Sequence, residues 1–104
     1  MVDNRKLMVY TFPVIESFKH KGLKELFAKG GSSKVRQDQG ARILRRLHAL
    51  DAASRPEQLN LPGFDFHALK GKPKRYSVHV NGPWTITFGW AGDNATDVNL
   101  EQYH

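Results

Sequence analysis

The sequence predicts an α+β domain in which two N-terminal helices pack on one face of a small, mainly antiparallel sheet. Two patterns lead to this fold class. Between residues 20 and 50, apolar residues recur at three-and-four spacing, the period of an amphipathic helix. From residue 76 onwards, apolar and polar residues alternate in short runs divided by turn residues, which is typical of antiparallel strands. The 104 residues fit one domain with a modest core.

The first residues precede these patterns and show no firm period. We interpret residues 1–13 as an N-terminal extension, either poorly ordered or an edge strand, and residues 14–104 as the domain. Residues 11–18 contain enough apolar side chains for a short strand. Because Pro13 has no N–H to donate, this strand lies at a sheet edge or begins after the proline.

Two helices are predicted next. The first covers residues 20–29, and Gly30–Gly31 ends it. Ser32 or Ser33 is placed to cap the second. The apolar stripe of that second helix is Val35, Ile43, Leu44, Leu47 and Leu50. Its exposed edge carries Arg42, Arg45 and Arg46. Gly40 would cost about 1 kcal/mol relative to alanine inside a helix, so it marks a close packing contact or a weak point.

The C-terminal part is predicted to form the sheet. Residues 52–60 are a linker with one short helical turn. Strands over residues 76–80 and 84–90 form a hairpin, and a last strand covers residues 95–102. The core-facing side chains of these strands are predicted to be Tyr76, Val78, Val80, Trp84, Ile86, Phe88, Trp90, Val98 and Leu100. The opposite face of the first strand carries Ser77 and His79.

The net charge of +6 is concentrated in one segment. Residues 19–46 contain nine lysines and arginines against two acids, whereas the positive and negative charges of the other segments nearly cancel. A local excess of this kind suits a polyanion such as nucleic acid, or an acidic protein surface. The alternative is a well-solvated helical surface with no partner.

Several function classes lack their sequence signatures. There is no cysteine, so disulfides and thiolate metal sites are excluded. The five histidines do not have zinc-motif spacing, and no phosphate-binding glycine loop or GxSxG turn is present. We therefore expect no metal and no cofactor. With no membrane-length apolar run and no signal-peptide segment, the sequence predicts a soluble cytoplasmic protein that does not bind membranes.

Three motifs occur in a fixed order: FKHKGLKELFAKG at residues 18–30, FHALKG at residues 66–71 and YSVHVNGPWTITF at residues 76–88. The chain ends in Glu-Gln-Tyr-His at residues 101–104. In the order and spacing of these motifs, and in its last residues, the chain resembles the HigB toxins of bacterial toxin–antitoxin systems. The resemblance covers roughly residues 14–104. HigB toxins belong to the RelE superfamily of ribosome-dependent mRNA endonucleases.

The resemblance implies a RelE-like microbial ribonuclease fold. It also implies that the protein enters the ribosomal A site and cleaves the message there. Its implied partners are mRNA, the ribosome with its ribosomal RNA, and a HigA-like helix-turn-helix antitoxin. In similar toxins the histidine and lysine of an H-x-L-K-G segment, and the acid, tyrosine and histidine at the C-terminus, form the site. Carried over by motif, these catalytic roles fall on His67, Lys70, Tyr103 and His104.

Basic residues outside this set are candidates for RNA binding. Those in the turn before the hairpin are Lys72, Lys74 and Arg75. Those on the predicted helices are Lys21, Lys24, Arg42, Arg45 and Arg46. Phosphate contacts of this kind hold RNA without reading its sequence.

The sequence departs from the family pattern at two positions. The family commonly has an arginine where this chain has Thr85, and an aspartate where it has Gln102. Threonine cannot clamp a phosphate, and an amide cannot take up a proton as a carboxylate can. The alternative to an mRNA endonuclease is therefore a protein of the same fold that binds RNA or an antitoxin without cutting.

Metal-independent RNA cleavage explains why these residue types are needed. The 2′-hydroxyl attacks phosphorus, so the site needs a base, an acid for the departing 5′-oxygen, and cations for the extra charge. Histidine can act as base or acid near neutral pH. Our hypothesis is that His67 and His104 share these two duties. Lys70 would stabilise the phosphate, with Lys74 or Arg75 as candidates to replace the missing arginine, and Tyr103 would contact a nucleotide.

Overall fold

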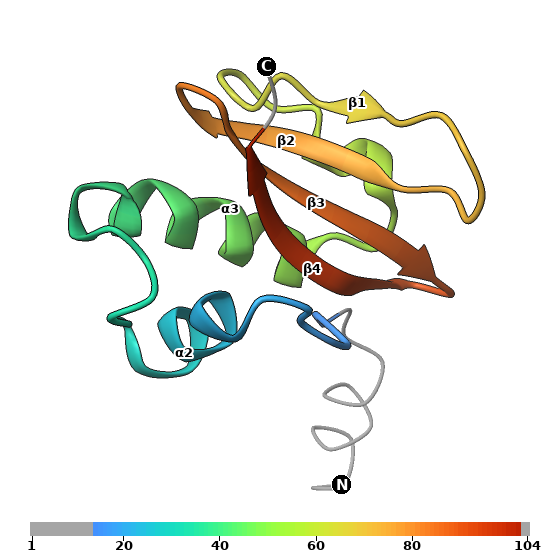
Figure 1. Ribbon diagram of the computed structural model, residues 1–104. Helices are drawn as coiled ribbons and strands as arrows, with labels where there is room; N and C mark the ends of the chain where they lie inside the picture. Colours follow the sequence, from blue (N-terminus) through green and yellow to red (C-terminus); the bar gives the residue numbers. More distant parts are fainter. Residues whose placement is uncertain (1–13, 103–104) are drawn as a thin grey trace, which may run out of the picture.

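The computed structural model describes residues 14–102 (Figure 1). Its helical elements are α2 (Lys21–Lys29), the 3₁₀ turn η1 (Gln37–Gln39), α3 (Gly40–Ala52) and the 3₁₀ turn η2 (Pro56–Leu59). Its strands are β1 (His67–Ala68), β2 (Tyr76–Asn81), β3 (Trp84–Ala91) and β4 (Asn94–Gln102). The strands form one antiparallel sheet in the order β1-β2-β3-β4. The α+β class and the predicted hairpin are confirmed, whereas the predictions for residues 1–13, Tyr103 and His104 lie outside the described residues.

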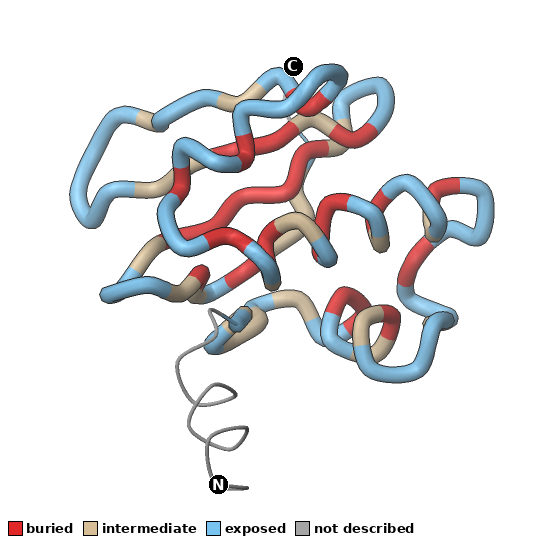
Figure 2. The backbone as a smooth tube through the Cα atoms, turned by 180° about the vertical axis from the view of Figure 1, so that it is seen from behind, coloured by how far each residue is buried: buried red, intermediate tan, exposed pale blue. Residues whose placement is uncertain are grey.

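The core lies between the two helices and one face of the sheet. Figure 2 shows buried backbone along the middle strands and on one side of α3. Fully buried side chains from the sheet are Val78, Ile86, Phe88 and Val98, and those from the helices are Leu23, Ile43, Leu47 and Leu50. Trp84, Trp90 and Leu100 pack against this cluster while remaining partly exposed. The alternation of the sequence therefore identified the core face of β2, β3 and β4, whereas β1 was not predicted.

The segment before α2 runs beside β4. Ile15 and Phe18 form isolated parallel bridges to Ala95 and Val98. Backbone hydrogen bonds join Glu16 N–H to the Ala95 carbonyl and Val98 N–H to the Ser17 carbonyl. The described part of this segment, residues 14–18, contains these bridges in place of the predicted continuous strand. It nevertheless covers one half of the β4 edge, as an edge strand would.

Helix α2 ends where its sequence predicts and begins one residue later than predicted, at Lys21. His20 precedes it, and the ring Nδ1 of His20 accepts a hydrogen bond from Leu23 N–H at 3.2 Å. Gly30 follows it with φ of 83°, and its N–H donates to the Leu26 carbonyl at 2.8 Å. A left-handed residue satisfies a carbonyl that the helix itself leaves unpaired, so glycine ends the helix here.

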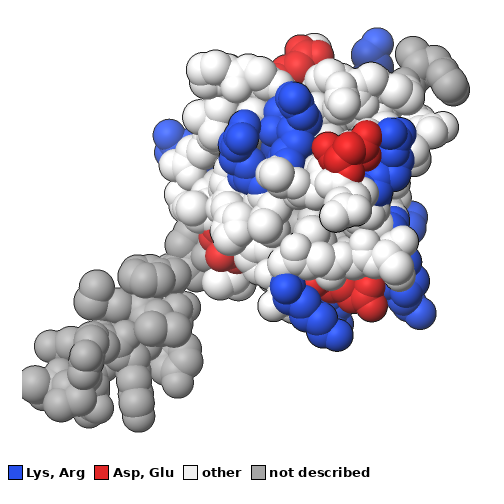
Figure 3. Space-filling model, turned by 90° about the vertical axis from the view of Figure 1, so that its left-hand side faces the viewer, with Lys and Arg blue, Asp and Glu red and all other residues white. Residues whose placement is uncertain are grey.

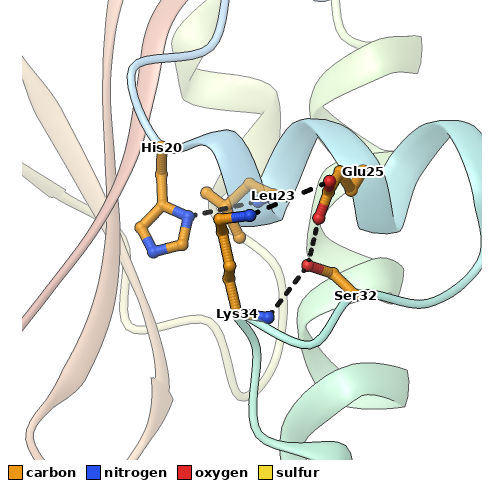
Figure 4. A network of polar contacts seen from close by, with 5 residues as sticks. All are labelled: His20, Leu23, Glu25, Ser32 and Lys34. Carbon is orange, nitrogen blue, oxygen red and sulfur yellow. Dashed lines mark hydrogen bonds and ion pairs between the residues drawn. The ribbon is translucent and has the colours of Figure 1, made fainter.

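The prediction that Ser32 or Ser33 caps the second helix is wrong, because α3 begins at Gly40. Ser32 instead donates to the Glu25 carboxylate at 2.7 Å and accepts Lys34 N–H at 3.1 Å (Figure 4). These bonds hold residues 30–36 as a loop against α2. The Ser32 hydroxyl and the nearby Lys34 ammonium lower the pKa of Glu25. A carboxyl group whose pKa is lower in the folded protein than in the unfolded chain stabilises the fold at pH above the unfolded pKa. This stabilisation is lost as the pH falls through the folded pKa.

The prediction that Arg46 lies on an exposed edge is also wrong, since its side chain is 3% exposed. Its guanidinium donates to the carbonyls of His79 at 2.8 Å, Gly63 at 3.2 Å and Arg42 at 3.1 Å. The guanidinium carbon also lies 4.5 Å from the ring centre of Phe64. Burial, followed by the charges of Arg42 and Arg45, lowers the pKa of Arg46. Arg46 therefore joins α3 to β2 and to the loop before β1, and its donors are not free for RNA.

Candidate active site on the polar face of the sheet

The face of the sheet turned away from the helices is polar. Directly opposed residues of an antiparallel pair project from the same face. The first row across the strands is His67, Ser77, Thr87 and Asn99, and the second is His79, Thr85 and Glu101. The rows between them, such as Val78, Ile86 and Leu100, belong to the core side. Backbone alternation thus places the two rows over β1 to β4 on one surface, which we call the polar sheet face.

A small cleft of about 200 Å³ opens on this face. Its lining residues are Asp65, His67, Ser77, His79, Gly82, Pro83 and Thr85. Ser77 and Thr85 are 5% and 8% exposed, so they form its floor, whereas His67 and Asp65 stand at its edge with exposed side chains. Because the floor side chains are short and polar, the cleft has room for a phosphate group beside the exposed imidazole.

Two histidines of the cleft have defined polar partners. His67 Nε2 lies 3.2 Å from the Asp65 carboxylate. Asp65 has φ of 46°, a left-handed backbone conformation that is uncommon for a residue other than glycine. His79 Nε2 lies 2.8 Å from the Gly82 carbonyl, and therefore donates its N–H to it. The His79 ring is thus held by the hairpin turn, and the exposed Asp65 carboxylate lies beside the His67 ring at the cleft edge.

Arg75 crosses the polar sheet face beside the cleft. Its Nη2 donates to Thr87 Oγ1 at 3.2 Å and to the Asp97 carbonyl at 2.9 Å. The Thr87 hydroxyl, which is 0% exposed, in turn donates to the Glu101 carboxylate. At Gly89 a Cβ would lie 2.8 Å from Thr96 Oγ1 and 3.5 Å from Arg75 Nη1, so glycine leaves the space that this arrangement needs. A cation is therefore fixed across β3 and β4.

The sequence-predicted site residues that are described and not buried separate into three groups. His67 and Arg75 lie on or beside the polar sheet face. Lys70, Lys72 and Lys74 are exposed on the loop between β1 and β2. The exposed basic residues of the helices are Lys21, Lys24, Arg42 and Arg45. They belong to elements packed on the core side of the sheet, away from the cleft. In Figure 3 the basic side chains of one face form separate groups with acidic side chains between them.

Three ionisable residues in the cleft or on the polar sheet face were not assigned a catalytic or RNA-binding role from the sequence: Asp65, His79 and Glu101. His79 and Glu101 could have been found from the strict alternation of their strands, which places both opposite the apolar side chains. Asp65 has no such signal, since its position depends on a loop conformation. Among residues 14–102, no three histidine, aspartate or glutamate side chains are grouped as metal ligands. Within the same range, no helix has the length and apolar character needed to cross a membrane.

Comparison with known proteins identifies similar chains. Residues 16–104 match the family model of HigB-like toxins, described as the RelE-like toxin of the type II toxin–antitoxin system HigB. The chain is also 44% identical over 92 residues to the endoribonuclease HigB of Proteus vulgaris. That alignment covers 88% of this chain and 100% of the relative.

Proposed function

The chain belongs to the HigB-like toxins, the RelE-like toxins of type II toxin–antitoxin systems, and we propose that it cleaves mRNA in the ribosomal A site by metal-independent acid–base catalysis. Its endoribonuclease activity follows from the family and from the similarity to the Proteus vulgaris endoribonuclease HigB. We also propose that cleavage depends on the ribosome and that the residues named below carry it out. Residues 14–104 form the toxin domain in this proposal, with a RelE-like fold.

The observation that carries the proposal is the His67–Asp65 pair at the edge of the polar cleft. A carboxylate within hydrogen-bond reach fixes the ring of a proton-transfer histidine, and the short floor residues Thr85 and Ser77 admit a phosphodiester beside it. In our proposal His67 and His104 share proton abstraction from the 2′-hydroxyl and proton donation to the 5′-oxygen. Tyr103 stacks on or hydrogen-bonds to a nucleotide.

Cations near the cleft support charge stabilisation. Lys70 follows β1, which carries His67, and its exposed ammonium is free to approach phosphate. Arg75 is the better candidate than Lys74 to replace the arginine that similar toxins have at the position of Thr85. Its guanidinium is bonded to Thr87, two positions along β3 from Thr85 and on the same face, whereas Lys74 is exposed on the loop. Preorganised cations lower the barrier because they need no rearrangement as charge develops.

The partners in this proposal are a translating ribosome carrying mRNA and a HigA-like antitoxin, and its location is the cytoplasm. Translation supplies both the substrate and the place of cleavage. A second candidate function is binding without cleavage by the same fold. Thr85 and Gln102, which replace an arginine and an acid of similar toxins, are the observation that favours it.

Expression in growing bacteria followed by mapping of mRNA 5′ ends tests the proposal. We expect new 5′-hydroxyl ends inside translated frames, and none in the same messages when their start codons are removed. The matched control is His67→Ala, which should give far fewer new ends than the parent. Ends that persist without translation would contradict ribosome dependence. Growth arrest without any new ends would favour the non-cleaving alternative.

The exposed basic residues of the helices predict a salt-dependent affinity for ribosomes. Replacing both Lys21 and Lys24 by alanine, or both Arg42 and Arg45, should weaken binding at low salt. For every phosphate that a variant no longer neutralises, the slope of log K against log salt should decrease by about 0.7 to 0.9. Sedimentation with ribosomes over a range of salt concentrations measures this slope. Arg55→Ala, an exposed cation just before η2, is the control, and equal slopes for all variants would contradict the prediction.

A further inference from the structure

The strand register decides which C-terminal side chain shares a face with His67. Gln102 is opposite Trp84, and it projects from the same face as Leu100, which packs against the core. Glu101 is opposite Thr85, which lines the cleft. Residue 102 occupies the position where similar toxins carry an acid, but here it faces away from the cleft. Of residues 101 and 102, it is Glu101 whose side chain lies on the cleft side of the sheet, in addition to the Asp65 carboxylate at the cleft edge.

We propose that Glu101 is a catalytic residue of this chain and accepts the proton of the attacking 2′-hydroxyl. The inference rests on the proposed endoribonuclease function and refines it. One of the two proton transfers is assigned to a carboxylate, and the other remains with an imidazole. The second imidazole would then act as a cation beside the phosphate. On this assignment the amide at Gln102 does not impair cleavage.

The surroundings of Glu101 fix its carboxylate on the polar sheet face. The Thr87 hydroxyl has one proton, and because it accepts a hydrogen bond from Arg75 Nη2, it donates that proton to Glu101. Thr87 is fully buried, so this donor cannot be exchanged readily for water. A carboxylate has four lone-pair positions on its two oxygens, so the bond from Thr87 leaves capacity for a substrate hydroxyl. Glu101 itself is only half-buried and reaches solvent.

The position across the sheet suits a pair of proton-transfer groups. Glu101 is on β4 and His67 is on β1, with β2 and β3 between them. Three strand spacings place the two backbones about 14 Å apart. Ser77, Thr85 and Thr87 occupy intervening positions, and their side chains are short. The His79 ring opposite Thr85 is hydrogen-bonded to the Gly82 carbonyl at the hairpin turn, and the Arg75 guanidinium is hydrogen-bonded to Thr87. A phosphodiester over Thr85 would therefore have the imidazole on one side and the carboxylate on the other, as in-line displacement requires.

In the proposed step one proton leaves the 2′-oxygen and another reaches the 5′-oxygen. The 2′-oxygen transfers its proton to Glu101 and uses the released electron pair to form a bond to phosphorus. The bond between phosphorus and the 5′-oxygen breaks, and its electron pair goes to that oxygen. The 5′-oxygen then receives a proton from an imidazolium. The products are a 2′,3′-cyclic phosphate and a 5′-hydroxyl, and both protein groups regain their protonation states by exchange with water.

Exchanging the residue types at positions 101 and 102, which preserves the net charge, tests the inference when it is compared with the two single substitutions. Single-turnover cleavage of mRNA on programmed ribosomes is measured for the parent, Glu101→Gln, Gln102→Glu, and the double variant that carries both changes. We expect Glu101→Gln to cleave about 100-fold or more slowly, the usual effect of losing a general base. Gln102→Glu should match the parent. The double variant has the composition and net charge of the parent, and it should remain as slow as Glu101→Gln.

Two further measurements separate catalysis from folding. Thermal unfolding and ribosome binding of each variant should stay close to those of the parent, so that the loss appears in the cleavage rate alone. Parent-level cleavage by Glu101→Gln, or recovery of cleavage in the double variant, would overturn the inference while leaving the endoribonuclease function in place. A loss of rate explained by a lower melting temperature would also overturn it. An inactive parent would overturn the proposed function and this inference together.

Discussion

Substituting His67 by alanine is expected to slow cleavage of translated mRNA by about 100-fold to 10,000-fold. The imidazole stands at the edge of the cleft, 3.2 Å from the Asp65 carboxylate, and we propose it as a proton-transfer group because the motif and the described geometry agree at this position. Removing it leaves the other residues of the cleft in place, so binding to ribosomes should change little. Single-turnover cleavage and ribosome binding, measured on the same preparations, separate the two effects.

The matched control for this substitution is His48→Ala. His48 is exposed on α3, on the core side of the sheet and away from the polar cleft. It should cleave at the parent rate. His104→Ala is the companion variant, because the second imidazole in the proposal is that of His104. If His67→Ala and His104→Ala both cut at the rate of the parent, the assignment of the proton transfers to histidine is wrong.

Substituting Arg46 by alanine is expected to lower the free energy of unfolding by about 3 kcal/mol. The change leaves the carbonyls of His79, Gly63 and Arg42 without the donors that satisfy them in a region closed to solvent. It also removes the packing of the guanidinium on Phe64. Urea unfolding followed by tryptophan fluorescence measures the loss as a shift in midpoint.

Two variants show whether the hydrogen bonds carry this effect. Arg46→Met keeps the apolar stem and removes every donor, so it should be nearly as unstable as the alanine variant. Arg45→Ala, at the exposed neighbouring position, should lie within about 0.5 kcal/mol of the parent. A stable Arg46→Met protein would indicate that packing alone matters at this position. Because Arg46 holds the His79 carbonyl, reduced cleavage should accompany the loss of stability.

Much of the fold could be predicted from the sequence because the relevant signals are local. The alternation of residues 76–80 and 84–90 identified two strands and the face that each buries. The spacing before Gly30 identified α2 and its end. In each case the side chains that define the element lie within one or two turns, or within a few strand positions, so their spacing is visible along the chain.

Capping and burial of single polar residues were predicted less well. Serine is a residue type that commonly caps helices, yet the Ser32 hydroxyl donates a hydrogen bond to Glu25 of the preceding helix. Arg46 has the position of a surface arginine on an amphipathic stripe, yet three carbonyls from separate segments surround it. A side chain with several donors can be buried wherever the fold supplies enough acceptors, and those acceptors are distant in the sequence.

By itself, the sequence determined the α+β class, the two helices followed by the hairpin and the last strand, the family and the motif that contains His67. Only the tertiary structure decided that Glu101 rather than Gln102 shares the polar sheet face with that histidine, that Arg75 is fixed there, and that Arg46 is interior. The physical reason is strand register. Neighbouring residues of a strand project from opposite faces, so the pairing of β3 with β4 determines which side chain reaches the cleft.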